Sequence, residues 1–247
     1  MSMVIGSILQ NRNTENFTTA IKNGEGYRHG VRSPMRNGLS LNNMLRGGNI
    51  VKKIPTLFER IYEGHHIVGI TPKVTPGMEW VLNGEGTATV KWDGACCAII
   101  NGELYKRYDA KKGKTPPNGA IPCCEPDPIT GHWPHWIKCD RNNPADKWFW
   151  EAYEKEVRIS FMLAGKEPSD GTYEAVGKHF NGNPYGFEFD SLIKHGGGLH
   201  PKVPRNFEGI RAFLEANPIE GIVFWKDGEP QCKIKRSDFG FEWGGKI

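Results

Sequence analysis

The sequence has no run of apolar residues that approaches the roughly 20 needed for a helix to cross a bilayer. It also lacks a positively charged start followed by a long apolar stretch, which is the pattern of a secretory signal. We therefore expect no membrane association and a cytoplasmic protein. Within a length of 247 residues, 38% are hydrophobic and 11% are aromatic. This composition is sufficient for the core of one domain of good size.

The sequence also lacks a CxxC motif, although it contains six cysteines. Two pairs of cysteines are adjacent in sequence, which is poor geometry for ordinary disulfides, so we expect reduced thiols. One stretch brings cysteines and histidines together, and a zinc site there is an open alternative, although the spacing matches no common zinc pattern. That stretch contains Cys123, Cys124, His132, His135 and Cys139.

Most of the chain also lacks net charge. The formal net charge is +4, and residues 1–50 carry all of it, with six Lys or Arg against two Glu. The remaining 26 basic and 26 acidic residues cancel. Residues 1–48 are rich in Asn, Gly and Ser and show weak periodicity, so we expect a basic, disordered N-terminal tail there. The domain that follows, residues 49–247, must then bind any polyanion through local patches.

Residues 87–108 are predicted to form a β-meander, because β-prone segments alternate with residue pairs typical of tight turns. The turn pairs are Asp93-Gly94 and Asn101-Gly102. The strands are expected at 87–92, 96–100 and 103–108. Lys91 would then lie at the end of the first strand, at the rim of a sheet.

Beyond this meander the pattern alternates between helices and short strands. The first helix is indicated by apolar residues that recur at i+4, by an Asn-Pro start and by a glycine stop, and the second is expected to end at Asn217-Pro218. The expected elements are an irregular stretch over 110–140, helices over 143–165 and 207–216, strands over 172–176 and 186–190, and a hairpin of 221–225 with 231–235. The expected fold class is α+β, with central antiparallel sheets flanked by helices.

Four charged residues lie on the predicted strands or at their ends. Lys91 precedes the Asp93-Gly94 turn, and taken alone it would be a surface lysine beside a β-turn. Glu220 comes directly before an apolar strand. Lys233 and Lys235 are two residues apart on the last strand, so their side chains share one face. Two ammonium groups on one face are unfavourable unless an anion such as a triphosphate lies between them.

In order and spacing, four segments resemble the motifs of the covalent nucleotidyltransferases, which comprise DNA ligases, RNA ligases and capping enzymes. Lys91–Gly94 resembles motif I, Tyr173–Gly177 motif III, Glu220–Val223 motif IV and Lys233–Lys235 motif V. The resemblance implies the nucleotidyltransferase, or ligase adenylation, fold over residues 49–247. We expect no OB-fold domain, because twelve residues follow Lys235.

A narrower resemblance is to a family of small ATP-dependent RNA ligases that includes a human 5′-to-3′ RNA ligase and bacterial and phage relatives. It rests on Asn181–Gly186, on Ile193–Gly196, on Gly131-His132 with Trp136, and on the cysteines after motif I, Cys96 and Cys97. By this resemblance the two cysteines are core residues and not redox centres.

The resemblance implies an enzyme that joins a 5′-phosphate to a 3′-hydroxyl of RNA through a covalent lysyl-AMP and an adenylylated RNA. Lys91 would be the nucleophile, and its amine, with an ordinary pKa of about 10.4, must be deprotonated before it attacks ATP. Lys233 and Lys235 would hold the α-phosphate, and their charge would favour the neutral amine. Glu220 would hold Mg²⁺ or Mn²⁺, and Glu174 would contact the ribose or the metal ion.

Further residues are expected to contact ATP or RNA. Asp93 and Gly94 belong to the ATP-binding motif, and Arg107 would contact the nucleotide sugar or an RNA phosphate. Either Phe187 or Phe189 would stack on adenine, and the alternative is that both are ordinary core aromatics. A basic patch with interleaved tyrosines is typical of contact with single-stranded RNA, and a solvated loop is the alternative. This patch contains Lys106, Arg107, Lys111, Lys112 and Lys114.

Two other functions remain open at this point. The chain could be another covalent nucleotidyltransferase, of DNA-ligase or capping type, or a non-catalytic RNA-binding protein that kept the fold. A binding protein would not need Lys91, Lys233 and Lys235 intact, which favours the enzyme. The sequence predicts neither the identity of the RNA nor the oligomeric state nor any protein partner.

Overall fold

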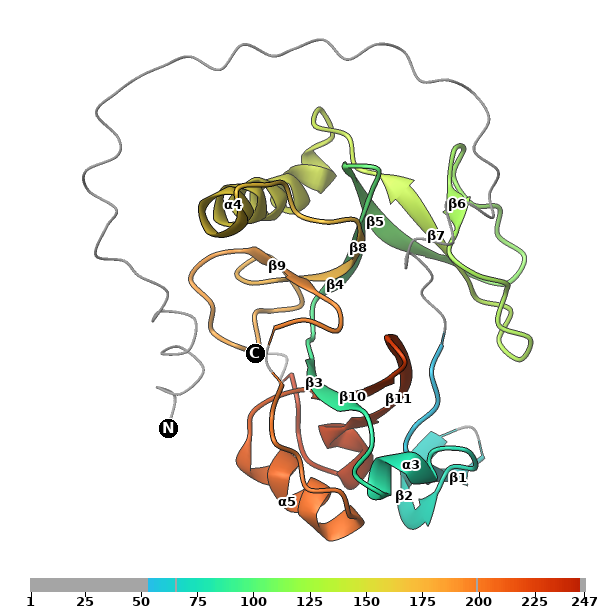
Figure 1. Ribbon diagram of the computed structural model, residues 1–247. Coiled ribbons are helices and arrows are strands. Elements are labelled where there is room, and N and C mark those ends of the chain that lie inside the picture. The colour runs from blue at the N-terminus through green and yellow to red at the C-terminus, as the bar shows by residue number, and fades with distance from the viewer. Residues whose placement is uncertain (1–52, 65, 199, 245–247) are drawn as a thin grey trace. The chain divides into compact units, whose positions relative to one another are not determined.

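The structure is a computed structural model that describes residues 53–64, 66–198 and 200–244 (Figure 1). The tail expected over residues 1–48 lies outside the described residues. In the described part of the chain, three antiparallel sheets and a few helices form an α+β fold, as the sequence predicts. No helix in this part is both long and apolar enough to cross a membrane.

A three-stranded sheet in the order β11-β10-β3 carries three of the four motifs. Its strands are β3 (Thr87–Lys91), β10 (Gly221–Lys226) and β11 (Glu229–Lys235). The predicted hairpin of β10 and β11 is confirmed, and its turn residues Asp227 and Gly228 have φ of 54° and 78°. Positive φ at both turn positions is the reason for the Asp-Gly pair, because few other residues adopt that conformation at low cost.

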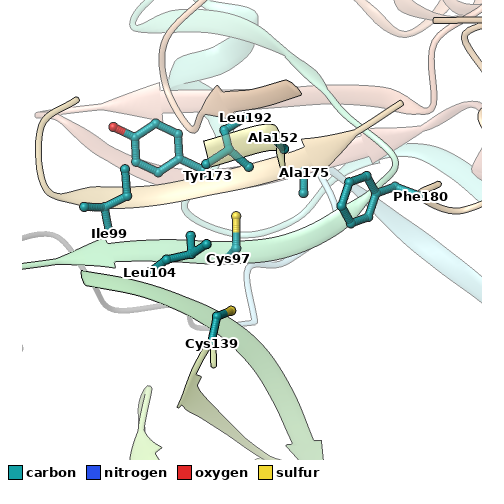
Figure 2. Packing of buried hydrophobic residues seen from close by; sticks show 9 residues of the cluster. All are labelled: Cys97, Ile99, Leu104, Cys139, Ala152, Tyr173, Ala175, Phe180 and Leu192. Atoms are coloured by element: carbon teal, nitrogen blue, oxygen red, sulfur yellow. The ribbon is translucent and has the colours of Figure 1, made fainter. Parts of the chain in front are cut away.

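The larger sheet has six strands in the order β6-β7-β5-β4-β8-β9. These are β4 (Ala95–Ile100), β5 (Glu103–Ala110), β6 (Ile121–Pro122), β7 (Trp133–Lys138), β8 (Gly171–Val176) and β9 (Ser191–Lys194). Apolar side chains of this sheet are fully or almost fully buried together with Ala152 of helix α4, as Figure 2 shows for the residues it labels. One core cluster therefore lies between one face of the sheet and α4.

The two long helices are the ones predicted, and their ends follow capping rules. Helix α4 (Lys147–Ala164) follows a short 3-10 turn, η2 (Pro144–Asp146), and ends at Gly165, which has φ of 65°. Helix α5 (Phe207–Ala216) begins after Asn206, whose side chain accepts a hydrogen bond from the Gly209 N–H. A side-chain acceptor at the N-cap and a left-handed glycine after the last turn satisfy backbone groups that the helix leaves unpaired.

The predicted β-meander over residues 87–108 is confirmed in its second half, where β4 and β5 form a hairpin at Asn101-Gly102, and is wrong in its first half, because β3 and β4 belong to different sheets. Strand β3 pairs with β10, whereas β4 pairs with β5 and β8. The chain crosses between the sheets at Trp92–Gly94, and a Cβ on Gly94 would lie 2.1 Å from the Ala175 carbonyl oxygen. The Asp-Gly pair is thus required for a close passage of backbone against β8, and it does not make a hairpin.

A second correction concerns residues 186–190, which were predicted to be a strand. The segment is irregular, and the strand at this position is β9, which begins at Ser191. The side chain of Asn183 explains the difference, since it donates to the Phe187 carbonyl at 2.9 Å and accepts from the Phe187 N–H at 2.9 Å. These backbone groups are therefore unavailable to a sheet ladder.

Several elements were not predicted. The stretch over 110–140, expected to be irregular, contains β6 and β7. The additional elements are β1 (Phe58–Glu63), β2 (His66–Val74), α3 (Glu79–Leu82) and the 3-10 turn η3 (Arg236–Phe239). Strands β1 and β2 pair only with each other among the described strands, and η3 follows β11 directly.

Candidate active site

Lys91 and Lys235 meet at a single carboxylate, that of Glu220. In the register of the three-stranded sheet, Gly221 of β10 lies opposite Lys91 of β3 on one side and opposite Lys235 of β11 on the other. Glu220 precedes this point, and its side chain is almost completely buried. One carboxylate oxygen forms an ion pair with the Lys91 ammonium, and the other lies 2.7 Å from Lys235 Nζ.

Gly221 allows this convergence because the neighbouring backbone is very close. A Cβ at this position would lie 2.2 Å from the Ile234 carbonyl oxygen. Only glycine leaves room for β10 and β11 to approach with Glu220 directed between the two lysines. The close approach of the two strands therefore explains why a glycine follows Glu220.

Lys233 adds a third ammonium group to the same place. Partial burial, followed by the charges of Lys91, Lys235 and Arg60, lowers the pKa of Lys233 to about 8, while Glu220 raises it. Arg60 is itself paired with Asp238, at 2.9 Å. Three lysines around one glutamate leave an excess of positive charge, so this surface is suited to an anion. The prediction that Lys233 and Lys235 share a face is confirmed by this common neighbourhood.

Glu174 connects the six-stranded sheet to the segment that follows Lys91. One of its carboxylate oxygens accepts a hydrogen bond from the Gly94 N–H at 3.1 Å. The other lies 3.0 Å from Nε2 of His195. Motif III and motif I, which are about 80 residues apart in sequence, are thus joined at the crossing between the two sheets.

Asp93 is held by three side chains for which the sequence predicts no role. Its backbone N–H donates to the Tyr185 hydroxyl at 2.7 Å. One carboxylate oxygen accepts from the Asn181 amide at 3.0 Å, and the other accepts from the Trp243 indole N–H at 2.9 Å. Asn181 and Tyr185 lie in the segment that resembles small RNA ligases, whereas Trp243 gave no signal in the sequence.

The two candidate adenine-stacking residues lie in different environments. Phe187 is half-buried and packs on Tyr185 and Trp92, with ring centroids 5.4 Å and 6.0 Å away. Phe189 is 64% exposed, and the ammonium of Lys155 lies 5.1 Å from its ring centroid. Phe187 therefore belongs to an aromatic group next to motif I, and Phe189 is not a core aromatic.

In the predicted basic patch, Lys106 and Arg107 are paired with carboxylates, and the other three lysines are exposed. Lys106 forms an ion pair with the buried carboxylate of Asp146, so its charge is neutralised inside the fold. Arg107 donates two hydrogen bonds to Asp109, at 2.8 Å and 3.1 Å, and also faces the thiol of Cys96. The remaining members, Lys111, Lys112 and Lys114, are exposed.

Cysteines and histidines in residues 123–139 do not come together as a metal site. Cys123 and Cys139 are buried in two different core clusters. All six cysteines are free thiols, as expected, and burial raises the pKa of Cys139 to about 12. Within the described residues, the one group of three metal-binding side chains in close contact is Cys96, Glu174 and His195.

Comparison with known proteins shows a distant similarity to an RNA ligase. No protein-family model matches the chain. Over 141 residues the chain is 28% identical to a protein described as RNA ligase 1 from Pongo abelii. The matched region covers 46% of this chain and 42% of that protein, so the chain spans less than half of the relative's length. The chain is a distant homologue of RNA ligase 1.

Proposed function

We propose that this protein is an ATP-dependent RNA ligase with a nucleotidyltransferase domain over residues 49–247. It would join 5′-phosphate and 3′-hydroxyl RNA ends through a lysyl-AMP and an adenylylated RNA. The observation that supports this most is the arrangement of Lys91 and Lys235 on the two oxygens of Glu220, with Lys233 beside them. The distant similarity to RNA ligase 1 supports the same class of reaction.

In the first step, the amine of Lys91 attacks the α-phosphorus of ATP. A nitrogen–phosphorus bond forms, the bond to the bridging oxygen breaks, and pyrophosphate leaves. The amine must be neutral, and the neighbouring ammonium groups of Lys233 and Lys235 favour that form. The ion pair with Glu220 favours the charged form, so we expect the incoming phosphates to rearrange this pair. Lys233 and Lys235 then hold the α-phosphate.

Other contacts with ATP follow from the positions of the remaining motif residues. Glu174 and Gly94 are hydrogen-bonded to each other beside Lys91, so Glu174 is suited to bind the ribose. Phe187 is the better candidate to stack on adenine, because it packs on Trp92 of motif I. Asp93 would fix the end of the nucleophile segment through its three partners.

A divalent ion is part of this proposal. The carboxylates of Glu220 and Glu174 are hard oxygen donors beside a cationic phosphate site, which fits Mg²⁺ or Mn²⁺ bound mainly through phosphate oxygens. Such an ion would neutralise charge on the phosphates during displacement. Each carboxylate oxygen of Glu220 already forms an ion pair with a lysine, so the ion would contact Glu220 through water or after one lysine moves.

In the second and third steps, AMP passes to the RNA 5′-phosphate, and the 3′-hydroxyl then displaces AMP. We propose that Arg107, Lys111, Lys112 and Lys114 contact the RNA backbone, since they are exposed basic residues on β5 and in the loop that follows it. Lys106 is excluded from this role by its pairing with Asp146. The proposal includes a cytoplasmic location and a tail, residues 1–48, that formation of the Lys91 adduct does not require.

Covalent labelling tests the proposed function. The protein is mixed with radiolabelled ATP and Mg²⁺, and the modified peptide is mapped. We expect AMP on Lys91, no adduct in Lys91→Ala, and a native yield in Lys226→Ala, which removes an exposed lysine paired with Glu85 at the far end of β10. Labelling from GTP in place of ATP would favour a capping-type enzyme. The absence of any adduct would favour a non-catalytic RNA-binding protein.

A further inference from the structure

Three neighbouring strands of the six-stranded sheet bring three different metal-binding groups together. Cys96 of β4 and Glu174 of β8 are direct cross-strand partners, so their side chains lie on the same face. His195 follows the end of β9, and its backbone N–H donates to the Thr172 carbonyl of β8 at 3.0 Å. A thiol sulfur, a carboxylate oxygen and an imidazole nitrogen lie within 4.8 Å of one another.

We propose that Cys96, Glu174 and His195 form a binding site for a transition-metal cation of the Zn²⁺ class. Thiolate, imidazole and carboxylate are the ligands that Zn²⁺ takes in proteins, commonly as three protein ligands with an open fourth position. A hard cation such as Mg²⁺ prefers oxygen ligands and does not select a thiolate and an imidazole. The donor set therefore distinguishes this site from the phosphate-bound ion of the proposed reaction.

The surroundings of His195 and Glu174 orient their donor atoms. Nδ1 of His195 contacts the Thr172 hydroxyl at 2.9 Å, which turns Nε2 toward Glu174. One oxygen of Glu174 is held by the Gly94 N–H, which leaves the oxygen near His195 for a cation. Outer contacts of this kind fix the ring orientation of a metal-binding histidine. The cation would replace the hydrogen bond between His195 and Glu174.

The charges that face the cluster permit a divalent cation. Arg107 faces Cys96 and opposes a cation, but its guanidinium donates two hydrogen bonds to the Asp109 carboxylate, which offsets its charge. Glu174 contributes a negative charge within the cluster itself. On binding, the Cys96 thiol releases its proton to solvent and a sulfur–metal bond forms, so no oxidant or reductant is required.

The site has a consequence for catalysis, which rests on the proposed function. Glu174 is the residue that we assign to the ribose, and its Gly94 contact reaches the segment after Lys91. A Zn²⁺ ion on Glu174 would compete with the nucleotide for this carboxylate. We therefore expect Zn²⁺ to slow formation of the Lys91 adduct, and Cys96→Ser to make the reaction less sensitive to Zn²⁺.

Cobalt spectroscopy tests the site without any need for activity. The reduced full chain is titrated with Co²⁺, and thiolate-to-cobalt charge-transfer absorption is recorded, followed by displacement with Zn²⁺. We expect the band in the native protein and in Cys124→Ser, which removes another partly buried thiol. We expect no band in Cys96→Ser, and at least about tenfold weaker Co²⁺ binding in His195→Gln.

Two results would overturn this proposal: no charge-transfer band in the native protein, or a band that persists in Cys96→Ser. Circular dichroism on each variant ensures that loss of the band does not reflect unfolding. If Cys96→Ser fails to fold, the His195→Gln variant is used in its place. An unchanged Co²⁺ affinity in His195→Gln would then refute the site. If no adduct with AMP ever forms, the proposed function fails, but the cobalt spectra still decide the metal site.

Discussion

The ammonium of Lys235 lies 2.7 Å from one oxygen of Glu220, while the other oxygen of the same carboxylate holds Lys91. Glu220 thus divides its charge between the proposed nucleophile and a proposed phosphate ligand. Lys235→Ala should remove a phosphate contact and also leave Glu220 to pair with Lys91 alone, which favours the charged amine. Lys233→Ala should remove a phosphate contact and one positive charge near Lys91, but it leaves Glu220 shared between Lys91 and Lys235.

We expect either substitution to slow both adduct formation and final sealing by about two to three orders of magnitude, the effect of losing a preorganised charge contact. Because of the Glu220 pairing, Lys235→Ala should slow the first step more than Lys233→Ala does. Lysine-to-arginine variants should recover little, since the planar guanidinium is larger. Single-turnover rates with ATP and with pre-adenylylated RNA measure the two steps. Rates within about twofold of native for both variants would contradict these roles.

Binding of the ATP phosphates should weaken above about pH 8. The pKa of Lys233 is lowered to about 8, chiefly by burial, and a bound triphosphate would raise it again. Below that pH the lysine is protonated in both free and bound protein, so its titration does not affect binding. Above it, binding requires uptake of a proton, and the Kd should rise by up to about tenfold per pH unit.

Lys233→Arg supplies the control for this pH dependence, because arginine stays charged throughout the range. The Kd of a non-hydrolysable ATP analogue, measured between about pH 7 and pH 9.5, should rise for the native protein and stay nearly level for the variant. A native profile that is level, or one that the arginine variant reproduces, would remove Lys233 from the phosphate site.

The contact between Trp243 and Asp93 predicts a role for the last described residues in adenylylation. Trp243→Phe keeps an aromatic ring against Tyr185 but removes the N–H that holds one Asp93 oxygen at 2.9 Å. A hydrogen bond to a charged group contributes about 1.5–3 kcal/mol, so adduct formation should slow by about tenfold or more. Trp133→Phe is the matched control, since it removes a 2.7 Å indole bond to the Cys124 carbonyl in another part of the fold. Equal rates for the two variants would show that the Asp93 contact has no special role.

Residues 1–48 carry the formal excess of positive charge but none of the motifs. Their deletion should leave formation of the Lys91 adduct unchanged. RNA binding should weaken modestly, and more so at low salt, because a charged tail acts through screened electrostatics. Adduct yield and RNA affinity at two salt concentrations measure both effects. If the shortened chain cannot form the adduct, the proposed domain boundary is wrong.

Sequence patterns were sufficient to predict the parts of the site that depend on local rules. The period of two in Lys233–Lys235 gave the shared face, and the Asp227-Gly228 pair gave the hairpin that presents it. The patterns could not show that β3 pairs with β10, because Lys91 and Glu220 are 129 residues apart and no local rule selects strand partners at that distance.

The errors and omissions come from contacts with distant segments and, in one case, from a local side chain that competes for backbone groups. Asp93-Gly94 has the composition of a hairpin turn, but tertiary contact with Ala175 makes it a crossing between sheets. Asn183 overrides the strand propensity of residues 186–190 by binding the backbone of Phe187. Trp243 enters the site only through contact with a distant segment and gave no signal in the sequence. His195 lies in the Ile193–Gly196 segment that resembles small RNA ligases, but no local pattern showed that it faces Glu174.

Substitution of Arg107 distinguishes two assignments for this residue of the basic patch: contact with RNA phosphate or contact with the nucleotide. Its guanidinium is oriented by Asp109 on the exposed side of β5, and it lies on the same sheet as Glu174. If it binds RNA phosphate, Arg107→Ala should slow sealing of pre-adenylylated RNA by about tenfold or more while adduct formation changes little. Lys112→Met, which removes a charge from the exposed loop without touching β5, should have a smaller effect on sealing and a reduced dependence on salt. Equal damage by Arg107→Ala to both steps would place Arg107 on the nucleotide instead. Within the patch, the RNA contact would then depend on Lys111, Lys112 and Lys114, and a triple substitution of these lysines should reduce the salt dependence of RNA binding.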